Sequence, residues 1–430
     1  LAHTVNFTGE QYGVPFAFSQ DGKTFACALQ PGGIRLYDPA TWKPANEIKL
    51  SAHMDDYVRA IAFLPGGTTL ILHHGRDQVE RRDIGAEKPT WTIKEDMLAL
   101  AVAPDGKRVA VSNAKGVSIR SAADGSEERL IPVTPDAESR VAYQVRADAL
   151  AFSPDGSLLA MTRWDEGDVF VWDVATGSEY RRLVGHPVPD HTRIGETTVT
   201  FSADGRWLAT GHADRTTRVW EVATGKEALR LIGHDATVSG ASFSRDGRTL
   251  LTTGGVEVLL WDLRSGSTAT TNLDTLWADL ASDDAGKAYK AAATLSARDN
   301  VPEFLRGKLP PVAAVDPERV AKLVAELDSG RFAVREAAKK ALADLGGAAQ
   351  KALEAGLKKG PSAEGRARIE ELLTRLVKPL AGTEAREARA VQALQWSGTA
   401  AARAVLKEWA AGAAGARLTE EAKRGVGVME

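Results

Sequence analysis

Eight histidines offer the most obvious capacity for chemistry in this sequence, and all of them lie between His3 and His234. A histidine beside a carboxylate can act as a general base, and grouped histidines can bind a metal ion. His186 and a nearby carboxylate could be mistaken for such a catalytic pair. His73 and His74 are adjacent, and neighbouring side chains on a strand point to opposite faces, so these two are not expected to share one metal ion.

The sequence motifs that usually accompany catalysis are absent. The chain has no Gly-x-Ser-x-Gly elbow, no glycine-rich phosphate-binding loop and no His-Glu-x-x-His pair. Its single cysteine, Cys27, excludes a disulfide framework and a cysteine-rich zinc site. We therefore predict that the chain is not an enzyme and that it holds neither a metal ion nor a cofactor.

A repeated unit must position these histidines. The box Phe-Ser-x-Asp-Gly has four strong copies and two weaker ones, beginning at Phe18, Phe63 (weak), Val102 (weak), Phe152, Phe201 and Phe243. An apolar run precedes each box, and further β-rich runs separated by turn residues follow it. Four short strands per repeat, at a spacing of roughly 40–50 residues, predict the blades of a β-propeller.

The repeats resemble those of the WD-repeat family. The runs VFVWDVATG (169–177), TRVWEVATG (217–225) and VLLWDLRSG (258–266) carry the likeness, and each follows a Phe-Ser-x-Asp-Gly box. Other residues stand at the tryptophan position in the first three repeats: Tyr37, Arg82 and Arg120. The resemblance covers residues 1–272 and implies a WD-repeat β-propeller with six visible blades, or seven in the full-length protein.

The resemblance also implies a role for the best-placed histidine. In this family a histidine, a strand hydroxyl, a loop aspartate and a tryptophan form a buried hydrogen-bonded tetrad that braces a blade. The fifth repeat matches all four positions, with His186, Thr210, Asp214 and Trp220. The sixth offers a partial set, for which we expect His234, Thr253 and Trp261.

The pattern changes after the propeller. Alanine, lysine, glutamate and leucine dominate, and apolar residues recur at helical spacing. Asp316-Pro317 predicts a helix start, and Gly346-Gly347 a helix end. The stretch LDSGRFAVREAAKKALADLG resembles HEAT-like repeats of the bilin-lyase type. We expect a helical linker over 273–315 and a HEAT-like α-helical repeat domain over 316–430.

The residues expected to bind partners lie mainly in long loops on one face of the propeller. In the WD-repeat family the loops that end the second and fourth strands emerge together on the usual partner-binding face. Exposed aromatic and arginine side chains are common anchors in such interfaces. The candidates are Tyr12, Tyr57, Arg82, Arg120, Tyr143, Trp164, His191, Arg193 and His212. Arg82 and Arg120 could instead form an anion-binding notch, or simply pack inside degenerate blades.

The N-terminus predicts that the polypeptide continues upstream. Leu1-Ala2-His3 matches the end of a fourth strand, and no initiator methionine precedes it. A seventh blade or further domains could lie there. No leader peptide or membrane-spanning run is visible, but the expected upstream segment leaves the compartment open.

Composition and motifs together favour a binding function. The net charge of −3 argues against a nucleic-acid-binding protein dominated by electrostatics. We expect a non-catalytic scaffold whose partners are other proteins or peptides. Two alternatives remain open at this point. One is a sensory or regulatory tail of a larger signalling protein, and the other is a propeller with enzymatic activity that binds a metal ion or small ligand.

Overall fold

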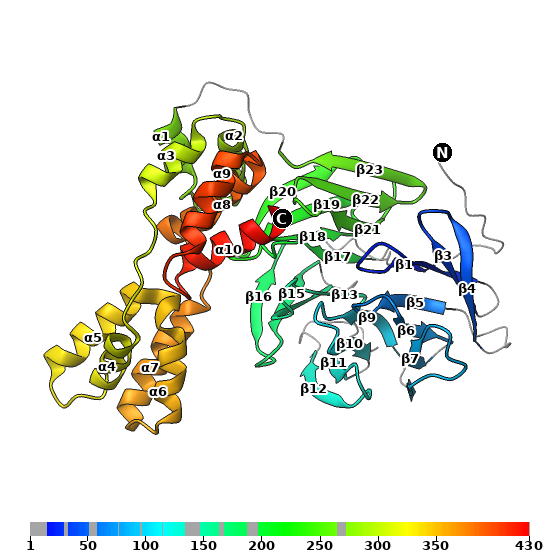
Figure 1. Ribbon diagram of the computed structural model, residues 1–430, viewed down its shortest axis with the longest axis horizontal. Coiled ribbons are helices and arrows are strands. Elements are labelled where there is room, and N and C mark those ends of the chain that lie inside the picture. The colour runs from blue at the N-terminus through cyan, green and yellow to red at the C-terminus, as the bar shows by residue number, and fades with distance from the viewer. Residues whose placement is uncertain are drawn as a thin grey trace.

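The computed structural model describes residues 15–29, 33–50, 58–75, 77–94, 97–113, 115–133, 147–162, 167–186, 197–264 and 272–429. A β-propeller of six blades is followed by a helical region, and the two parts are in contact (Figure 1). The predicted fold class is confirmed. In this described part of the chain, no helix is both long enough and apolar enough to cross a bilayer.

Each blade is one antiparallel sheet in which consecutive strands pair. Blades 1 to 3 comprise β1 (Phe16–Phe18), β2 (Phe25–Leu29), β3 (Gly33–Asp38) and β4 (Lys43–Lys49); β5 (Val58–Phe63), β6 (Thr69–His74), β7 (Gln78–Asp83) and β8 (Trp91–Lys94); β9 (Met97–Val102), β10 (Arg108–Asn113), β11 (Gly116–Ser121) and β12 (Glu127–Pro132). Blades 4 to 6 comprise β13 (Ala149–Phe152), β14 (Leu158–Thr162), β15 (Val169–Asp173) and β16 (Glu179–Leu183); β17 (Thr198–Phe201), β18 (Trp207–Gly211), β19 (Thr216–Glu221) and β20 (Lys226–Ile232); β21 (Val238–Phe243), β22 (Thr249–Gly254) and β23 (Glu257–Asp262).

A serine and an aspartate shape the turn between the first two strands of a blade. In blade 4 the Ser153 hydroxyl donates to Asp155 (2.6 Å), and Asp155 also accepts from the backbone N–H of Ser157 (3.0 Å). Gly156 completes the turn with a φ of 69°, a conformation that glycine adopts without a steric penalty. The serine–aspartate bond recurs in blades 1, 5 and 6. This local geometry explains why the Phe-Ser-x-Asp-Gly box is repeated.

The helical region begins soon after blade 6. Its described elements are α1 (Leu273–Asp279), α2 (Ala285–Ser296), α3 (Val301–Lys308), α4 (Pro317–Glu326), α5 (Phe332–Leu345), the short 3-10 helix η1 (Gly346–Ala349), α6 (Gln350–Lys358), α7 (Ala363–Leu376), α8 (Gly382–Ser397), α9 (Ala400–Ala410) and α10 (Arg417–Met429). Asp316 caps α4 through the N–H of Glu318 (2.9 Å), and α5 ends at Gly346, as predicted.

Two separate hydrophobic cores divide the helices. Helices α4 to α7 enclose one core around Val324, Leu342, Leu353 and Ile369. Helices α1 to α3 and α8 to α10 share a second core that continues into blades 5 and 6. This grouping differs from the expected boundary at 315/316, because α8 to α10 return to pack against α2 and the propeller. The likeness of these helices to HEAT repeats stays a prediction.

The helices contact one side of the propeller. Their hydrogen bonds with described propeller residues involve the turns between first and second strands, the turns between third and fourth strands, or residues next to them. These turns belong to blades 4 to 6, and Figure 1 shows α10 beside this edge of the disc. The described C-terminal ends of the second and fourth strands lie at the other ends of the blades.

Candidate functional site

Four side chains of the fifth repeat form a continuous hydrogen-bonded chain. Trp220 Nε1 lies 2.9 Å from the Thr210 hydroxyl oxygen, which lies 2.9 Å from His186 Nε2. His186 Nδ1 in turn lies 3.1 Å from Asp214 Oδ2. Thr210 and Trp220 come from β18 and β19, and the turn between these strands supplies Asp214.

The donors and acceptors in this chain determine one arrangement of protons. The Asp214 carboxylate can only accept, so His186 donates to it from Nδ1. With the proton on Nδ1, His186 Nε2 accepts from the Thr210 hydroxyl, whose oxygen in turn accepts from the indole N–H of Trp220. Burial alone would raise the pKa of Asp214, but hydrogen bonds from His186 and Thr216 outweigh burial and hold that pKa well below its usual range.

The order Asp214–His186–Thr210 matches the order of a hydrolase triad, but the hydroxyl is not accessible. A nucleophile must reach the substrate, and Thr210 is only 1% exposed. Both His186 nitrogens and the Thr210 hydroxyl are already engaged within the blade. The arrangement can hold the strands in register; it offers no position for a reacting atom.

The sixth blade holds a shorter version of this chain, and it uses a different threonine from the one expected. Trp261 Nε1 donates to the Thr252 hydroxyl (2.8 Å), and His234 Nε2 lies 2.7 Å from the same oxygen. The expectation of Thr253 was wrong by one residue. Because strand side chains alternate, Thr253 points to the opposite face of the sheet.

We expect Thr252→Val to lower the free energy of unfolding by about 1–3 kcal/mol, because it leaves two buried polar groups, Trp261 Nε1 and His234 Nε2, without partners. Thr253→Val is the matched control and should change that free energy by less than about 0.5 kcal/mol. Urea unfolding followed by circular dichroism measures both values. A larger loss for Thr253→Val would contradict the assignment.

The hydrogen-bonded brace of tryptophan, threonine and histidine needs a hydroxyl nine positions after the start of the Phe-Ser-x-Asp-Gly box. This position holds threonine in blades 5 and 6, but Cys27 in blade 1 and Met161 in blade 4. Trp172 of blade 4 consequently has no hydrogen-bond partner for its buried indole N–H among the described residues. The tryptophan alone therefore does not indicate a brace.

His212 lies against this network without joining it. Its ring stacks on that of His186 with centroids 5.1 Å apart, and neither of its nitrogens has a hydrogen-bond partner in the described structure. Burial, followed by the nearby His186, lowers the pKa of His212 to about 4. The imidazole is therefore neutral at pH 7.

Three of these groups, His186, His212 and Asp214, have potential ligand atoms within 4.8 Å of one another. A metal ion bound there would need a lone pair from His186, yet Nε2 accepts from Thr210 and Nδ1 donates to Asp214. The rings of His186 and His212 are stacked in nearly parallel planes. The lone pairs of their ring nitrogens lie in those planes, so they do not converge on one ion. The donor set therefore fits the brace better than a metal centre.

Stability should fall as the pH drops from about 6.5 to about 4, because in that range His212 is protonated in the unfolded chain and neutral in the folded protein. This single group contributes a slope of at most about 1.4 kcal/mol per pH unit. His212→Leu should remove that part of the slope while leaving the slope between pH 7 and 8 unchanged. Equal slopes below pH 6.5 in both proteins would show that His212 is not held neutral by folding.

Three of the candidate partner-binding residues are described, and all three are turned inward. Arg82 pairs with buried Glu80 (2.9 Å), and Arg120 donates to the backbone carbonyl of Gly125 (3.0 Å) beside Glu127. His212 is 4% exposed. Each guanidinium already has a carboxylate neighbour in its own blade, so the anion-binding notch is not formed and these residues are not surface anchors. The remaining candidates lie outside the described residues: Tyr12, Tyr57, Tyr143, Trp164, His191 and Arg193.

The junction between propeller and helices contains a buried ion pair that sequence reasoning missed. Arg389 of α8 donates from Nε (2.8 Å) and Nη2 (2.6 Å) to the two oxygens of Glu221, at the end of β19. Its remaining nitrogen donates to the backbone carbonyls of Leu280 (2.7 Å) and Ser282 (2.9 Å). Both charged side chains are almost fully buried.

A second arginine reaches the helices from the propeller side. Arg206, in the first turn of blade 5, donates from Nε to Glu421 of α10 (2.8 Å) and from Nη1 to Asp204 (3.1 Å) and Gln395 (2.6 Å). Trp207 Nε1 donates to Gln392 (2.9 Å). In α8 the polar residues Arg389, Gln392 and Gln395 recur every three positions within an apolar sequence. This spacing puts them on one face and was the available signal.

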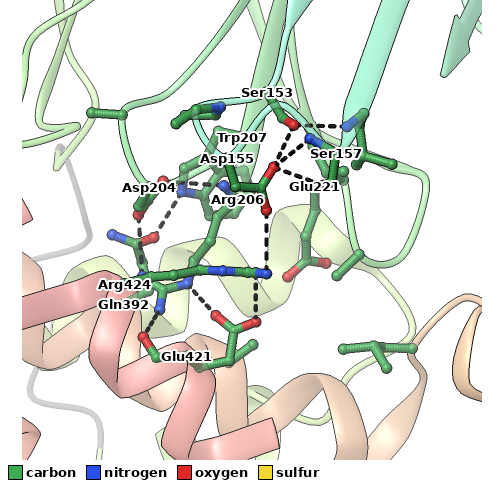
Figure 2. Close-up of a pocket in the computed structure, with 18 of the residues that line it drawn as sticks. Ser153, Asp155, Ser157, Asp204, Arg206, Trp207, Glu221, Gln392, Glu421 and Arg424 are labelled. Atoms are coloured by element: carbon green, nitrogen blue, oxygen red, sulfur yellow. Dashed lines mark hydrogen bonds and ion pairs between the residues drawn. The ribbon is translucent and has the colours of Figure 1, made fainter. Parts of the chain in front are cut away.

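A cavity of about 630 Å³ lies at this junction. Figure 2 shows Asp155, Arg424, Glu421 and Arg206 linked by ion pairs along one wall. The remaining lining is largely apolar and aromatic, including Leu158, Tyr180, Trp207, Val222, Leu376 and Val428. Gln392 also lines the cavity, and its buried Nε2 has no hydrogen-bond partner in the described part of the chain. The apolar and aromatic part of the lining could accept a small uncharged molecule.

Comparison with known proteins agrees with the architecture. The family model "WD domain, G-beta repeat" matches residues 177–221 and 225–262. An uncharacterized WD repeat-containing protein from Synechocystis sp. is 22% identical over 215 residues, which cover 47% of this chain and 57% of the relative. The alignment thus spans little more than half of the relative's length.

Proposed function

Because the chain carries WD40 repeats in a six-bladed propeller, we propose that it is a non-catalytic scaffold that presents rigid surfaces to other proteins. Propellers of this repeat type typically mediate protein interactions. The observation that carries the proposal is the one-sided attachment of the helices. Their hydrogen bonds with the described propeller residues lie at turns on one side of blades 4 to 6, and the opposite side is the one we assign to a partner.

The polar groups best suited to chemistry support the same conclusion. His186 and Thr210 bond to each other inside blade 5, while Glu221 and Arg389 neutralise each other at the junction. These groups maintain geometry, so the molecule can offer shaped surfaces held in a constant relation. The module of α4 to α7, which has its own core and extends away from the propeller in Figure 1, offers a second surface.

Charge reversal on the uncovered face tests this proposal. Lys115 and Arg215 are exposed in turns between second and third strands, so Lys115→Glu with Arg215→Glu changes that face without disturbing a core. The matched control is Arg319→Glu, on an exposed position of α4. Affinity capture from the native host, followed by quantitative mass spectrometry, should lose a set of partners with the double variant and retain it with the control. Equal recovery by all three proteins would contradict the use of this face.

A second candidate function is binding of a small neutral molecule in the junction cavity, and the apolar and aromatic part of its lining favours it. Arg206 is paired with Glu421, and Arg389 with Glu221, so this part of the cavity suits an uncharged ligand better than an ion. Such a ligand would contact both the propeller and α8.

A fluorescent ketone, 6-propionyl-2-dimethylaminonaphthalene, is a suitable probe because it is apolar and carries one carbonyl acceptor. Its emission should shift to the blue and saturate at one equivalent of protein. Val428→Trp, which adds bulk at the cavity wall, should abolish saturation, whereas Ala401→Trp on the exposed face of α9 should not. A signal that survives Val428→Trp would exclude this cavity as the binding site.

A further inference from the structure

Helices α4 to α7 form a module that is attached to the rest of the molecule at few places. Its core is built from residues between Val315 and Leu373. The described side chains of residues 316–376 form hydrogen bonds and ion pairs only within that range, as in the pair Lys339–Glu371 (2.7 Å). Polar contacts that fix the orientation of the module must therefore come from the entry segment, 309–316, and the exit segment, 377–381.

Backbone contacts hold the entry side of the module. The carbonyl of Val312 accepts from the N–H of Ala413 (2.9 Å). Gly347, in the short helix η1, lies directly against Gly415, so that a Cβ atom added to Gly347 would meet the Gly415 carbonyl. Two glycine backbones in contact have no side chains that interlock, and this point can therefore serve as a pivot.

The exit segment is held by blades 4 and 5. The N–H of Leu380 donates to the carbonyl of Ala223 in blade 5 (2.9 Å). Arg181 of β16 is 7% exposed, and its Nη1 donates to the carbonyls of Tyr180 (2.6 Å) and Val377 (2.7 Å). Among the described propeller residues, Arg181 alone bonds to this segment through its side chain. Tyr180 and Leu380 also line the junction cavity, so these contacts form part of its wall.

The equivalent arginine of blade 3 makes different contacts. Arg129 and Arg181 occupy the same register in the fourth strands of their blades. Arg129 donates through both terminal nitrogens to the turn of the next blade, at the carbonyls of Ala175 (2.8 Å) and Thr176 (2.9 Å). Arg181 reaches the corresponding carbonyl, that of Ala223, only at 3.4 Å and directs its other nitrogen to the exit segment. A contact that joins two blades elsewhere is therefore diverted to the helices.

We propose that Arg181 is a latch that sets the orientation of the α4–α7 module. A hydrogen bond donated by a charged group is stronger than one between neutral groups, which suits the Arg181–Val377 bond to this task. When that bond opens, the module swings as a rigid arm about the contact between Gly347 and Gly415. The functional meaning rests on the proposed scaffold, in which the latch fixes the angle between the two partner surfaces. The latch itself needs no partner for its test, so its failure and that of the scaffold are distinguishable.

Distances between pairs of spin labels test the latch. Ile232→Cys on β20 and Lys340→Cys on α5 carry the pair that reports on the arm. Ile232→Cys and Ala404→Cys on α9 carry a second pair, which reports on the helices packed against the propeller. All three positions are exposed, and the native Cys27 is fully buried. Double electron–electron resonance on residues 1–430 measures the width of each distance distribution.

Arg181→Met should broaden the distribution of the arm pair at least about twofold and leave that of the second pair unchanged, because only the arm is released. Arg181→Lys keeps a cation and much of the side-chain stem, which guards against a folding defect of the methionine variant. It lacks the forked donors of the guanidinium, so it should broaden the same distribution. Arg129→Met, which breaks the equivalent contact between blades 3 and 4, is the matched control and should change neither width.

Two results would overturn the latch. One is an arm-pair distribution that is as narrow in Arg181→Met and Arg181→Lys as in the unchanged protein. The other is equal broadening of both label pairs, because the whole helical region, and not the arm alone, would then have come loose.

Discussion

Replacing Arg389 with methionine should lower the free energy of unfolding by about 3–5 kcal/mol, because it leaves the buried carboxylate of Glu221 without its partner. Glu221 lies at the junction, where Arg389 supplies two short hydrogen bonds to it and also binds the carbonyls of Leu280 and Ser282. Urea unfolding monitored by circular dichroism gives the free energy. Loss of the Arg389–Glu221 pair should weaken the contact between α8 and blade 5 most strongly.

Two further variants separate the buried charge from a general effect of losing an arginine. Arg306→Met removes an exposed pair with Glu408 and should cost less than about 1 kcal/mol. Adding Glu221→Leu to Arg389→Met should recover a large part of the loss, because no uncompensated charge then remains in the junction. A double variant as unstable as Arg389→Met alone would mean that the unpaired carboxylate is not the cause.

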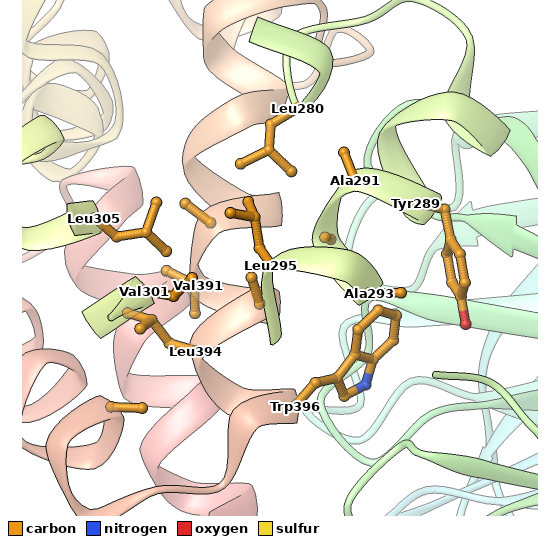
Figure 3. Packing of buried hydrophobic residues seen from close by; sticks show 14 of the residues in the cluster. Leu280, Tyr289, Ala291, Ala293, Leu295, Val301, Leu305, Val391, Leu394 and Trp396 are labelled. Atoms are coloured by element: carbon orange, nitrogen blue, oxygen red, sulfur yellow. The ribbon is translucent and has the colours of Figure 1, made fainter. Parts of the chain in front are cut away.

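Trp396→Ala should cost about 3–5 kcal/mol, because it leaves a cavity in the core shared by the propeller and the helices. The Trp396 ring stacks with Trp207 of blade 5 at 6.2 Å and meets Tyr289 of α2 edge-on at 5.0 Å. Figure 3 shows Trp396 and Tyr289 beside the packed side chains of α2 and α8. The indole N–H of Trp396 also donates to the carbonyl of Gly247 in blade 6 (3.3 Å).

The matched control is Phe332→Ala, which removes an exposed aromatic ring from α5 and should change the free energy by less than about 0.5 kcal/mol. Trp396→Phe keeps part of the ring contact and should lie between the two. The prediction is contradicted if Trp396→Ala is as stable as the control, since that would place the ring outside the shared core.

Much of the propeller could be predicted because its determinants are local. A Phe-Ser-x-Asp-Gly turn is built from bonds between residues two to five positions apart, such as Ser153 with Asp155. Thr210 lies nine positions after Phe201, and counting nine positions from Phe243 gives Thr252 in blade 6. The expectation of Thr253 was therefore an error of one position that the sequence could have corrected. The cap of α4 by Asp316 was predictable for the same reason.

The candidate site was less predictable because its partners are distant in sequence. Arg389 and Glu221 are separated by 168 positions, and Arg206 and Glu421 by 215. Arg389, Gln392 and Gln395 recur every three positions on one face of α8, but this spacing does not identify which blade supplies their partners. Arg82 and Arg120 could not be recognised as internally paired until their neighbouring carboxylates were placed in space.

The sequence by itself determined the repeat, the turns, the strand alternation and the positions where a tryptophan brace can form, since these depend on short spacings along the chain. Only the tertiary structure decided where the helices attach, which charges are buried together and which blade faces remain uncovered. Those outcomes depend on burial of side chains against surfaces contributed by distant segments. A periodic sequence marks the blade faces as apolar, and only the assembled ring distinguishes the covered faces from the exposed ones of blades 6 and 1.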